Sequence, residues 1–165
     1  MESKNLVDII GFEGLYKFDL DLNQVYSIKY NKYLKNHINN KGYYQVGLCK
    51  NSKYKSYKVH RLVYMCNNPT EDISLFEVDH IDNDRTNNKI ENLRKATSSQ
   101  NSSNAKTYIN NKLGVKYISE TRNSFRFRLV KNKIAYEKYF KNLQDAIDYR
   151  DIKVKEINGE FANLG

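Results

Sequence analysis

Apolar residues at every second position dominate the first third of the chain. The alternation is clear in Tyr16-Lys-Phe-Asp-Leu20 and again in Tyr44-Gln-Val-Gly-Leu48, and it is the pattern of strands with one buried face. Asn-Asn-Lys-Gly at 39–42 is typical of a turn between strands. Residues 15–58 are therefore predicted to form a small β-meander.

A helical period replaces the alternation from residue 59 onward. Apolar side chains recur at the spacing of one helix face, at Val59, Leu62, Val63 and Cys66. The helix is expected to end before Pro69, because proline disfavours helical backbone in the residue that precedes it. His60, Arg61 and Tyr64 are expected to face away from the apolar stripe. For His60 and Arg61 two interpretations stay open: solvated surface side chains, or contacts with backbone phosphates.

Alternation returns near the C-terminus. In the stretch Ser124-Phe-Arg-Phe-Arg-Leu-Val130, the aromatic and aliphatic side chains share one face of a strand. Arg126 and Arg128 share the other face. Asn132-Lys133 is expected to turn the chain into a next strand that ends near Phe140.

A second helical pattern follows this hairpin. Asn142 is a suitable N-cap and Gly159 a suitable C-terminal residue. The apolar stripe between them contains Leu143, Ala146, Ile147, Val154 and Ile157. Residues 113–165 are predicted to form a three-stranded antiparallel sheet backed by one helix, with arginines on the free face of the sheet.

Between these regions the chain is dense in polar residues. A strand-like run ends on Asp79-His80, an Asn-rich loop reaches Asn92, and Leu93-Arg94 begins a second short strand. Ser98 or Ser99 is expected to cap a helix that carries Asn101. A β-hairpin packed on one helix would bring Asp79, His80 and Asn101 together. The fold class predicted for the whole chain is α+β.

Composition limits the classes of protein to which the chain can belong. Hydrophobic residues make up 39% of the 165 residues, below the roughly 45–50% of a typical globular domain, which favours several thin cores over one large core. No apolar run approaches the roughly 20 residues of a membrane span, and the start MESKNLVDII is unlike a signal peptide. We expect an intracellular, cytoplasmic protein with no membrane partner. Cys49 and Cys66 stand in no CxxC pattern, so no structural zinc is expected.

Charge is segregated along the chain. Residues 1–69 carry 11 basic and 5 acidic side chains, and residues 106–165 carry 13 and 7, so each segment has a net charge of +6. Residues 70–105 carry 4 and 7, a net charge of −3, within a total of +9. Two basic flanks around an acidic centre favour a metal site held against a polyanion. Incidental unevenness in a basic protein is the alternative.

The central segment resembles the HNH nucleases of the ββα-metal class. The resemblance rests on Asp79-His80, on Asn92 twelve residues later and on Asn101 nine residues after that, a spacing similar to that of the phage homing endonucleases. Lys-Val-His-Arg-Leu-Val at 58–63 is similar to the helix that leads into the motif in that branch. The resemblance implies a domain at residues 59–105 that hydrolyses phosphodiester bonds in DNA.

The resemblance also implies a role for each residue. His80 would be the general base, and Asp79 and Asn101 would hold one divalent cation, with Mg²⁺ or Mn²⁺ favoured by oxygen ligands. Asn92 would pin the loop between the strands through its amide. Asn104 in place of Asn101, and Asp82 as an additional ligand, are alternatives. The remaining loop residues, Asn83, Asp84, Asn87 and Asn88, are expected to form the loop itself.

The two flanks resemble known DNA-binding modules. Residues 9–29, within a module predicted at 1–58, resemble the nuclease-associated modular motif of the NUMOD type. Residues 114–164, within a domain predicted at 106–165, resemble the ethylene-response-factor DNA-binding domain. That resemblance implies that Lys116, Arg122, Arg126 and Arg128 face double-stranded DNA. The alternative is a solvated sheet face on which basic residues discourage aggregation.

Together these features predict a metal-dependent HNH endonuclease of the homing type, associated with a mobile element such as an intron. One active site per chain predicts a monomer that nicks DNA, while double-strand cleavage would require a second copy or a second binding event. Two rivals remain: a DNA-binding regulator with an inactive HNH centre, and a relaxed-specificity nuclease acting in restriction or toxicity.

Overall fold

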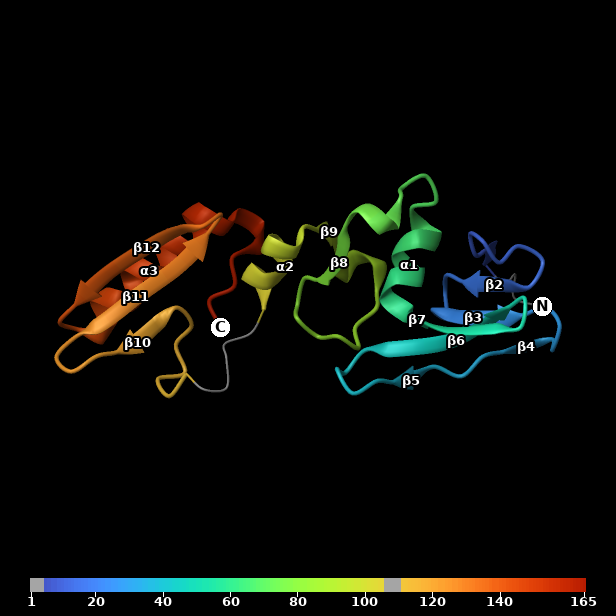
Figure 1. Ribbon diagram of the computed structural model, residues 1–165, viewed down its shortest axis with the longest axis horizontal. Helices are drawn as coiled ribbons and strands as arrows, with labels where there is room; N and C mark the ends of the chain where they lie inside the picture. The colour runs from blue at the N-terminus through green and yellow to red at the C-terminus, as the bar shows by residue number, and fades with distance from the viewer. Residues whose placement is uncertain (1–4, 106–110) are drawn as a thin grey trace. The chain divides into compact units, whose positions relative to one another are not determined.

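The computed structural model describes residues 5–105 and 111–165 and divides into two compact units, Met1–Lys95 and Ala96–Gly165 (Figure 1). Short antiparallel strands and a few helices make up both units, so the predicted α+β class is confirmed. No helix within the described ranges is both long and apolar enough to span a membrane. Each unit is described separately.

The first unit contains three small antiparallel sheets. The four-stranded sheet follows chain order and consists of β1 (Leu6–Asp8), β2 (Tyr16–Asp19), β3 (Gln24–Ser27) and β4 (Lys32–Tyr33). The second sheet consists of β5 (His37–Ile38), β6 (Tyr44–Lys50) and β7 (Lys53–Lys58), and the third of β8 (Glu77–His80) and β9 (Leu93–Ala96). The helical elements are α1 (Val59–Asn67), η1 (Ile73–Leu75) and η2 (Ile90–Asn92).

Helix α1 lies at the centre of this unit and contacts β2, β6, β7 and β8. Its predicted apolar stripe is confirmed, because all four residues of the stripe are buried. The prediction that the opposite face meets solvent is wrong for His60 and Tyr64, which are only 3% and 8% exposed. Tyr64 packs edge-on against Phe76, with ring centroids 5.6 Å apart. The cause is that α1 is covered by β8 and η2 as well as by the meander.

One hydrophobic core serves the whole first unit. It joins Phe18 and Val25 of the N-terminal sheet to Leu62 of α1 and to Val78 and Leu93 of the β8–β9 hairpin. The boundary predicted between residues 58 and 59 therefore runs through a shared core, because the meander alone leaves one face of its sheets to be covered by α1.

The second unit contains the sheet β10 (Ile118–Glu120), β11 (Phe125–Lys131) and β12 (Ile134–Phe140), with α3 (Leu143–Asn158) on one face (Figure 1). Its core is thin: Phe127, Leu129 and Val154 are buried, with partly buried aromatic residues around them. The predicted turn is confirmed, since Asn132 and Lys133 have φ of 51° and 66° and join β11 to β12. The remaining elements are α2 (Ser98–Asn104) and η3 (Gly159–Phe161).

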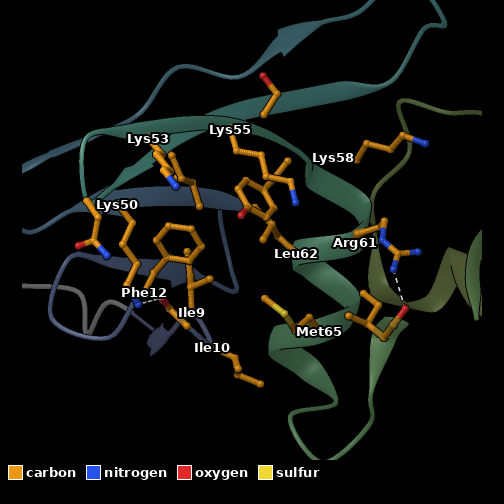
Figure 2. Close-up of a pocket in the computed structure, with 16 residues that line it drawn as sticks. Ile9, Ile10, Phe12, Lys50, Lys53, Lys55, Lys58, Arg61, Leu62 and Met65 are labelled. Carbon is orange, nitrogen blue, oxygen red and sulfur yellow. Dashed lines mark hydrogen bonds between the residues drawn. The ribbon is translucent and has the colours of Figure 1, made fainter. Parts of the chain in front are cut away.

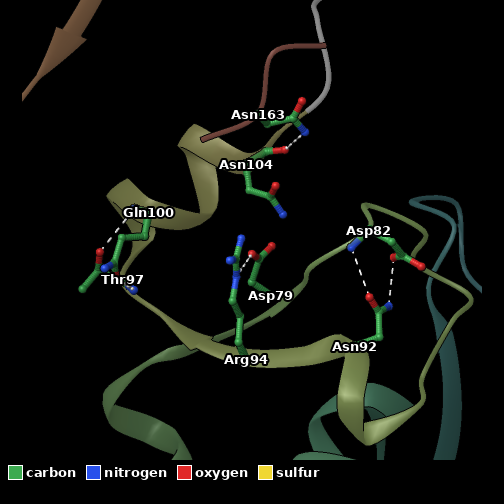
Figure 3. A network of polar contacts seen from close by, with 8 residues as sticks. All are labelled: Asp79, Asp82, Asn92, Arg94, Thr97, Gln100, Asn104 and Asn163. Atoms are coloured by element: carbon green, nitrogen blue, oxygen red, sulfur yellow. Dashed lines mark hydrogen bonds and ion pairs between the residues drawn. The ribbon is translucent and has the colours of Figure 1, made fainter. Parts of the chain in front are cut away.

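The cap of α2 differs from the prediction by one residue. Thr97, not Ser98 or Ser99, is the N-cap: its Oγ1 accepts a hydrogen bond from the backbone of Gln100 at 3.2 Å, and Gln100 Oε1 accepts from the backbone of Thr97 at 2.8 Å (Figure 3). This reciprocal pair needs Gln or Glu three residues after the cap. Only Thr97 meets that condition, so the helix begins there.

Candidate active site

The β8–β9 hairpin places two buried polar side chains at the end of β8. Asp79 and His80 are each 5% exposed. The loop that follows returns to the hairpin through a backbone hydrogen bond from Ile81 to Asn92, at 2.9 Å. Buried ionisable groups require partners, and the contacts of these two residues define the candidate site.

Asn92 joins the two ends of the loop. Its Oδ1 accepts from the backbone of Asp82 at 3.1 Å, and its Nδ2 donates to Asp82 Oδ1 at 2.9 Å and to the carbonyl of Asn87 at 2.8 Å (Figure 3). The contacts expected of a residue that pins the loop are present. The catalytic role of Asn92 stays a prediction.

The loop acids serve the loop rather than an ion. Asp82 Oδ1 also accepts from the backbone of Asp84, and Asp82 Oδ2 accepts from Asn87 at 2.7 Å. Partial burial raises the pKa of Asp82, yet hydrogen bonds from Asn87, Asp84 and Asn92 lower it overall. Asp84 accepts from both the backbone and the hydroxyl of Thr86. Both oxygens of Asp82 thus hold the loop together, and its role as an additional metal ligand stays an alternative.

His80 is held by a residue that sequence reasoning had assigned to the loop. Its Nε2 lies 3.0 Å from Oδ1 of Asn88, which is itself only 8% exposed. The carbonyl of Asn88 also accepts from Asn23 of the β2–β3 turn, at 3.4 Å. Nothing in an Asn-rich loop distinguishes Asn88 from its neighbours, because the distinction arises only when the loop folds over the histidine.

The rings of two other side chains pack near His80. The ring of His60 lies 4.8 Å from that of His80, and Tyr43 lies 5.1 Å from His60 and 6.0 Å from His80, between centroids. Burial, followed by the charges of His80, Lys58 and Arg61, lowers the pKa of His60 to about 3. The prediction that His60 contacts DNA finds no support in this fold, because the ring is 3% exposed and packs against His80. It is instead part of the support for His80.

His60 is therefore expected to make the fold acid-sensitive. Its pKa is about 3 when folded and 6.5 when free, so the unfolded chain binds the extra proton and stability falls as the pH drops from 6.5 toward 3. His60→Gln should remove up to about 1.4 kcal/mol per pH unit from the slope of the unfolding free energy between pH 6 and 5. Denaturant titrations measure this. His37→Gln, at an exposed position, should leave the slope unchanged, and equal slopes for all three proteins would contradict the prediction.

Asp79 forms an ion pair on β9. Its Oδ2 lies 3.0 Å from Nε of Arg94, and the two side chains are 6% and 13% exposed (Figure 3). A buried carboxylate at this position fits a divalent cation as one hard oxygen ligand. Among the residues that the structure describes, no three His, Cys, Asp or Glu side chains gather as a complete metal site. An ion bound at Asp79 would therefore need amide, water or substrate oxygens as well.

The residues predicted on α2 lie in the second unit. Asn101 is half-buried in the helix, and its backbone donates to the carbonyl of Thr97 at 2.9 Å. Asn104 is 4% exposed, and its carbonyl accepts from Asn163 at 2.6 Å (Figure 3). The choice of Asn101 as the metal ligand stays a prediction.

Two of the predicted DNA-binding cations serve the fold instead. Arg61 donates to the carbonyls of Ile73 and Phe76, at 2.6 Å and 3.2 Å. Lys116 is 8% exposed and donates to the carbonyls of Ser103, at 2.9 Å, and Ala105 at the C-terminal end of α2. Burial, and then Arg150, lower the pKa of Lys116 to about 8. These contacts give both side chains a structural role, because helix and loop carbonyls need donors; their contact with DNA stays a prediction.

The arginines of β11 lie as predicted on the face of the sheet opposite α3. Arg128 is exposed, and its Nε lies 3.6 Å from Glu137 on β12. Arg126 is half-buried and pairs in register with Tyr139, which is 55% exposed. Arg122 is exposed in the turn before β11. DNA binding by this face stays a prediction.

A separate groove lies on the other side of α1 in the first unit (Figure 2). Its volume is about 810 Å³, its floor contains Phe12, Leu62 and Met65, and lysines line its rim: Lys50, Lys53, Lys55 and Lys58 (Figure 2). Neither Asp79 nor His80 lines it. The candidate active site is therefore the polar hairpin and not this groove.

Comparison with known proteins connects this geometry to a family. Residues 57–103 match the family described as HNH endonuclease. The chain is 41% identical over 99 residues to DNA endonuclease I-HmuI of Bacillus phage SP01, covering 59% of this chain and 55% of the relative. It is 39% identical over 108 residues to an uncharacterised HNH endonuclease of Acanthamoeba polyphaga mimivirus, covering 64% and 55%. The chain thus spans little more than half the length of these relatives.

A solved structure is also similar to the chain. It is described as DNA binding and cleavage by the HNH homing endonuclease I-HmuI, and it matches with a TM-score of 0.56 and 28% identity, over 92% of this chain and 88% of that one. The predicted resemblance to HNH endonucleases is confirmed over the matched segment. The NUMOD-type and ethylene-response-factor-like resemblances of the flanks stay predictions.

Proposed function

We propose that the chain is a DNA endonuclease of the HNH type that hydrolyses one phosphodiester bond at a time. The observation that carries the proposal is the placement of His80, which follows Asp79 at the end of β8, is buried, and is hydrogen-bonded through Nε2 to Asn88. That arrangement lies inside the segment that matches the HNH endonuclease family. The similarity of the chain to I-HmuI in sequence and in structure also supports the proposal.

The contact between His80 Nε2 and Asn88 Oδ1 supports Nδ1 as the basic nitrogen. With Oδ1 of Asn88 as the acceptor, the proton of the neutral imidazole lies on Nε2 and the lone pair on Nδ1. Nδ1 takes a proton from a water molecule as the water oxygen attacks phosphorus. A new P–O bond forms, one ester P–O bond breaks, and the leaving oxygen acquires a proton from solvent.

Asp79 fits the role of a metal ligand in this reaction. When bound, a divalent cation such as Mg²⁺ or Mn²⁺ stabilises negative charge on the phosphate and leaving oxygens. Asp79 precedes His80 on β8, and its carboxylate has to release Arg94 before it can bind the ion. The amide ligand assigned to Asn101 by the resemblance is part of the same proposal.

Double-stranded DNA is the proposed substrate and partner. The net charge of +9 supports attraction to a polyanion. On the free sheet face of the second unit, Arg122, Arg126 and Arg128 are the proposed contacts, in line with the ethylene-response-factor-like resemblance. The NUMOD-like segment is the proposed contact in the first unit. Binding as a monomer follows from one candidate site per chain.

Removing the sheet-face arginines is expected to weaken DNA binding. The double variant Arg126→Ala, Arg128→Ala should raise Kd at least about tenfold, because each arginine paired with a guanine edge contributes roughly 1–3 kcal/mol. Fluorescence anisotropy with a labelled duplex measures the change. Lys155→Ala removes an exposed charge from α3 and serves as the control. A double variant that binds like the control would favour the solvated-face alternative.

Supercoiled plasmid tests the proposed activity directly. Folded protein with Mg²⁺ or Mn²⁺ should convert it to the nicked form, and protein with chelator should not. Plasmid that binds the protein but stays supercoiled with every metal would instead indicate a DNA-binding regulator with an inactive HNH centre. The ion pair between Asp79 and Arg94 is the observation that favours this alternative. Cleavage mapping on genomic DNA then separates homing, with one strong site, from a relaxed nuclease with scattered cuts.

A further inference from the structure

Two cations share one aromatic ring beside His80. Lys58 Nζ lies 4.6 Å from the centroid of the Tyr43 ring, and Arg85 Cζ lies 5.0 Å from it. The three residues come from the end of β7, the polar loop after β8 and the residue before β6. The same ring packs against His80, at 6.0 Å between centroids. The chain thus gathers positive charge at the edge of the candidate active site.

The two cations of this cluster form no direct ion pair within the part of the chain that the structure describes. Within residues 5–105, no ion pair joins Lys58 or Arg85 to an acid; the acids of the adjacent loop, Asp82 and Asp84, accept hydrogen bonds from the loop instead. Burial, then the charges of Arg61 and Lys41, lower the pKa of Lys58, and Arg85 lowers it further; only Glu77 acts in the opposite direction. Repulsion between these like charges destabilises the charged form of Lys58, and a bound anion would offset that repulsion.

Arg85 is oriented before any ligand arrives. Its Nη1 donates to the carbonyl of Lys41 at 2.8 Å, and its guanidinium lies over the Tyr43 ring. A guanidinium held by one hydrogen bond and one ring keeps further N–H donors free for a planar, forked contact. Lys58 adds a compact charge on a flexible stem. A guanidinium and an ammonium facing one site are the pair of donors that phosphate oxygens accept well.

We propose that Lys58 and Arg85, supported by Tyr43, form a binding site for one backbone phosphate of DNA next to the phosphate on which His80 acts. The proposal rests on the proposed function, because it assigns the neighbouring phosphate of the same substrate. The site fixes the register of the strand and so positions the ester bond relative to Nδ1 of His80. Lys58 and Arg85 are positioning residues for the reaction, since they do not touch the reacting atoms.

Salt dependence of DNA binding tests the site without any cleavage. Kd for a short duplex is measured by anisotropy in chelator at several salt concentrations, for Lys58→Met, Arg85→Met and the control Lys89→Met. Lys89 is an exposed cation of the same loop with no contact to Tyr43. Each of the first two variants should lower the slope of log K against log salt by up to about 0.9, the value for one lost phosphate contact. The control should keep the slope of the natural chain.

A phosphate scan identifies the contact. Duplexes with one neutral methylphosphonate at successive positions should reveal one position at which the natural chain loses affinity and Arg85→Met does not. Arg85→Lys keeps the charge and should restore most of the slope, whereas a residue that only supports Tyr43 would not be rescued in this way. Thermal unfolding of every variant guards against loss of the fold, and Lys58→Met, at an exposed strand end, carries the test if Arg85→Met is unstable.

Two outcomes separate this proposal from the proposed function. DNA binding and cleavage with unchanged slopes in both variants would overturn the phosphate site and leave the nuclease intact. Absence of DNA binding by the natural chain at low salt would overturn the proposed function and the site with it. Loss of slope with no position-specific effect in the scan would mean that the cations act through the general field of the protein, which also overturns the site.

Discussion

His80→Ala is expected to lower the rate of DNA cleavage by about 10²–10⁴-fold, the usual contribution of a positioned general base. DNA affinity should stay within a factor of two or so of the natural chain, because His80 is buried and adds no fixed charge when neutral. Single-turnover cleavage of plasmid with Mg²⁺ or Mn²⁺ gives the rate, and anisotropy in chelator gives the affinity.

The chain supplies a matched control for this substitution. His37 lies on β5, is exposed, and contacts Gln45, so His37→Ala removes an imidazole without touching the candidate site. His37→Ala should cleave at the natural rate. Equal rates for His80→Ala and His37→Ala would remove His80 from the mechanism, while loss of both binding and cleavage in His80→Ala would indicate a structural role.

Local signals in the sequence predicted the elements that local chemistry decides. Asn132 and Lys133 adopt positive φ between paired strands, as a two-residue hairpin turn requires. Asn142 caps α3 by accepting from the backbone of Gln144 at 2.7 Å. Alternation along β11 separated the buried Phe127 from the exposed Arg128. In each case the partners lie within a few residues, so the sequence contains the complete interaction.

Buried polar residues were predicted poorly because their partners lie far away in the chain. The sequence gives no reason to distinguish Lys116 from a surface cation, yet its ammonium donates hydrogen bonds to carbonyls at the end of α2. His60 lies on the polar side of an amphipathic pattern, yet the ring of His80, twenty residues later, covers it. The spacing of apolar residues predicts which face of a helix packs against a hydrophobic core. It does not predict whether other elements also cover the polar face.

The sequence predicted the acid and the base of the candidate site, but not the residues that hold them in place. Asp79 and His80 stood out because an acid and a base end a strand together. Asn88 and Tyr43 did not, since an amide among amides and a tyrosine among fourteen carry no distinctive signal. What makes them part of the site is contact: Asn88 orients His80, and Tyr43 joins His80 to the cations of the phosphate site proposed above.

Asp79→Asn is expected to have two large and separable effects. It removes the carboxylate that the proposal assigns to the ion, so cleavage should fall by about 10³-fold or more, the equivalent of several kcal/mol of lost charge stabilisation. It also removes the charge pair between Asp79 and the mostly buried guanidinium of Arg94, 3.0 Å away, which should lower the unfolding free energy by up to about 3–5 kcal/mol, the cost of breaking a buried ion pair from one side. Plasmid cleavage and denaturant titration measure the two effects.

A second substitution separates catalysis from stability. In Asp79→Asn, Arg94→Gln both charges of the buried pair are gone, so much of the lost stability should return while cleavage stays absent. Asp84→Asn, in the exposed loop, controls for loss of one negative charge and should keep near-normal cleavage. Recovery of cleavage together with stability in the double variant would show that Asp79 serves only as a partner for Arg94. In that case the metal-ligand role falls, because a ligand that binds the ion cannot be replaced by neutralising its neighbour.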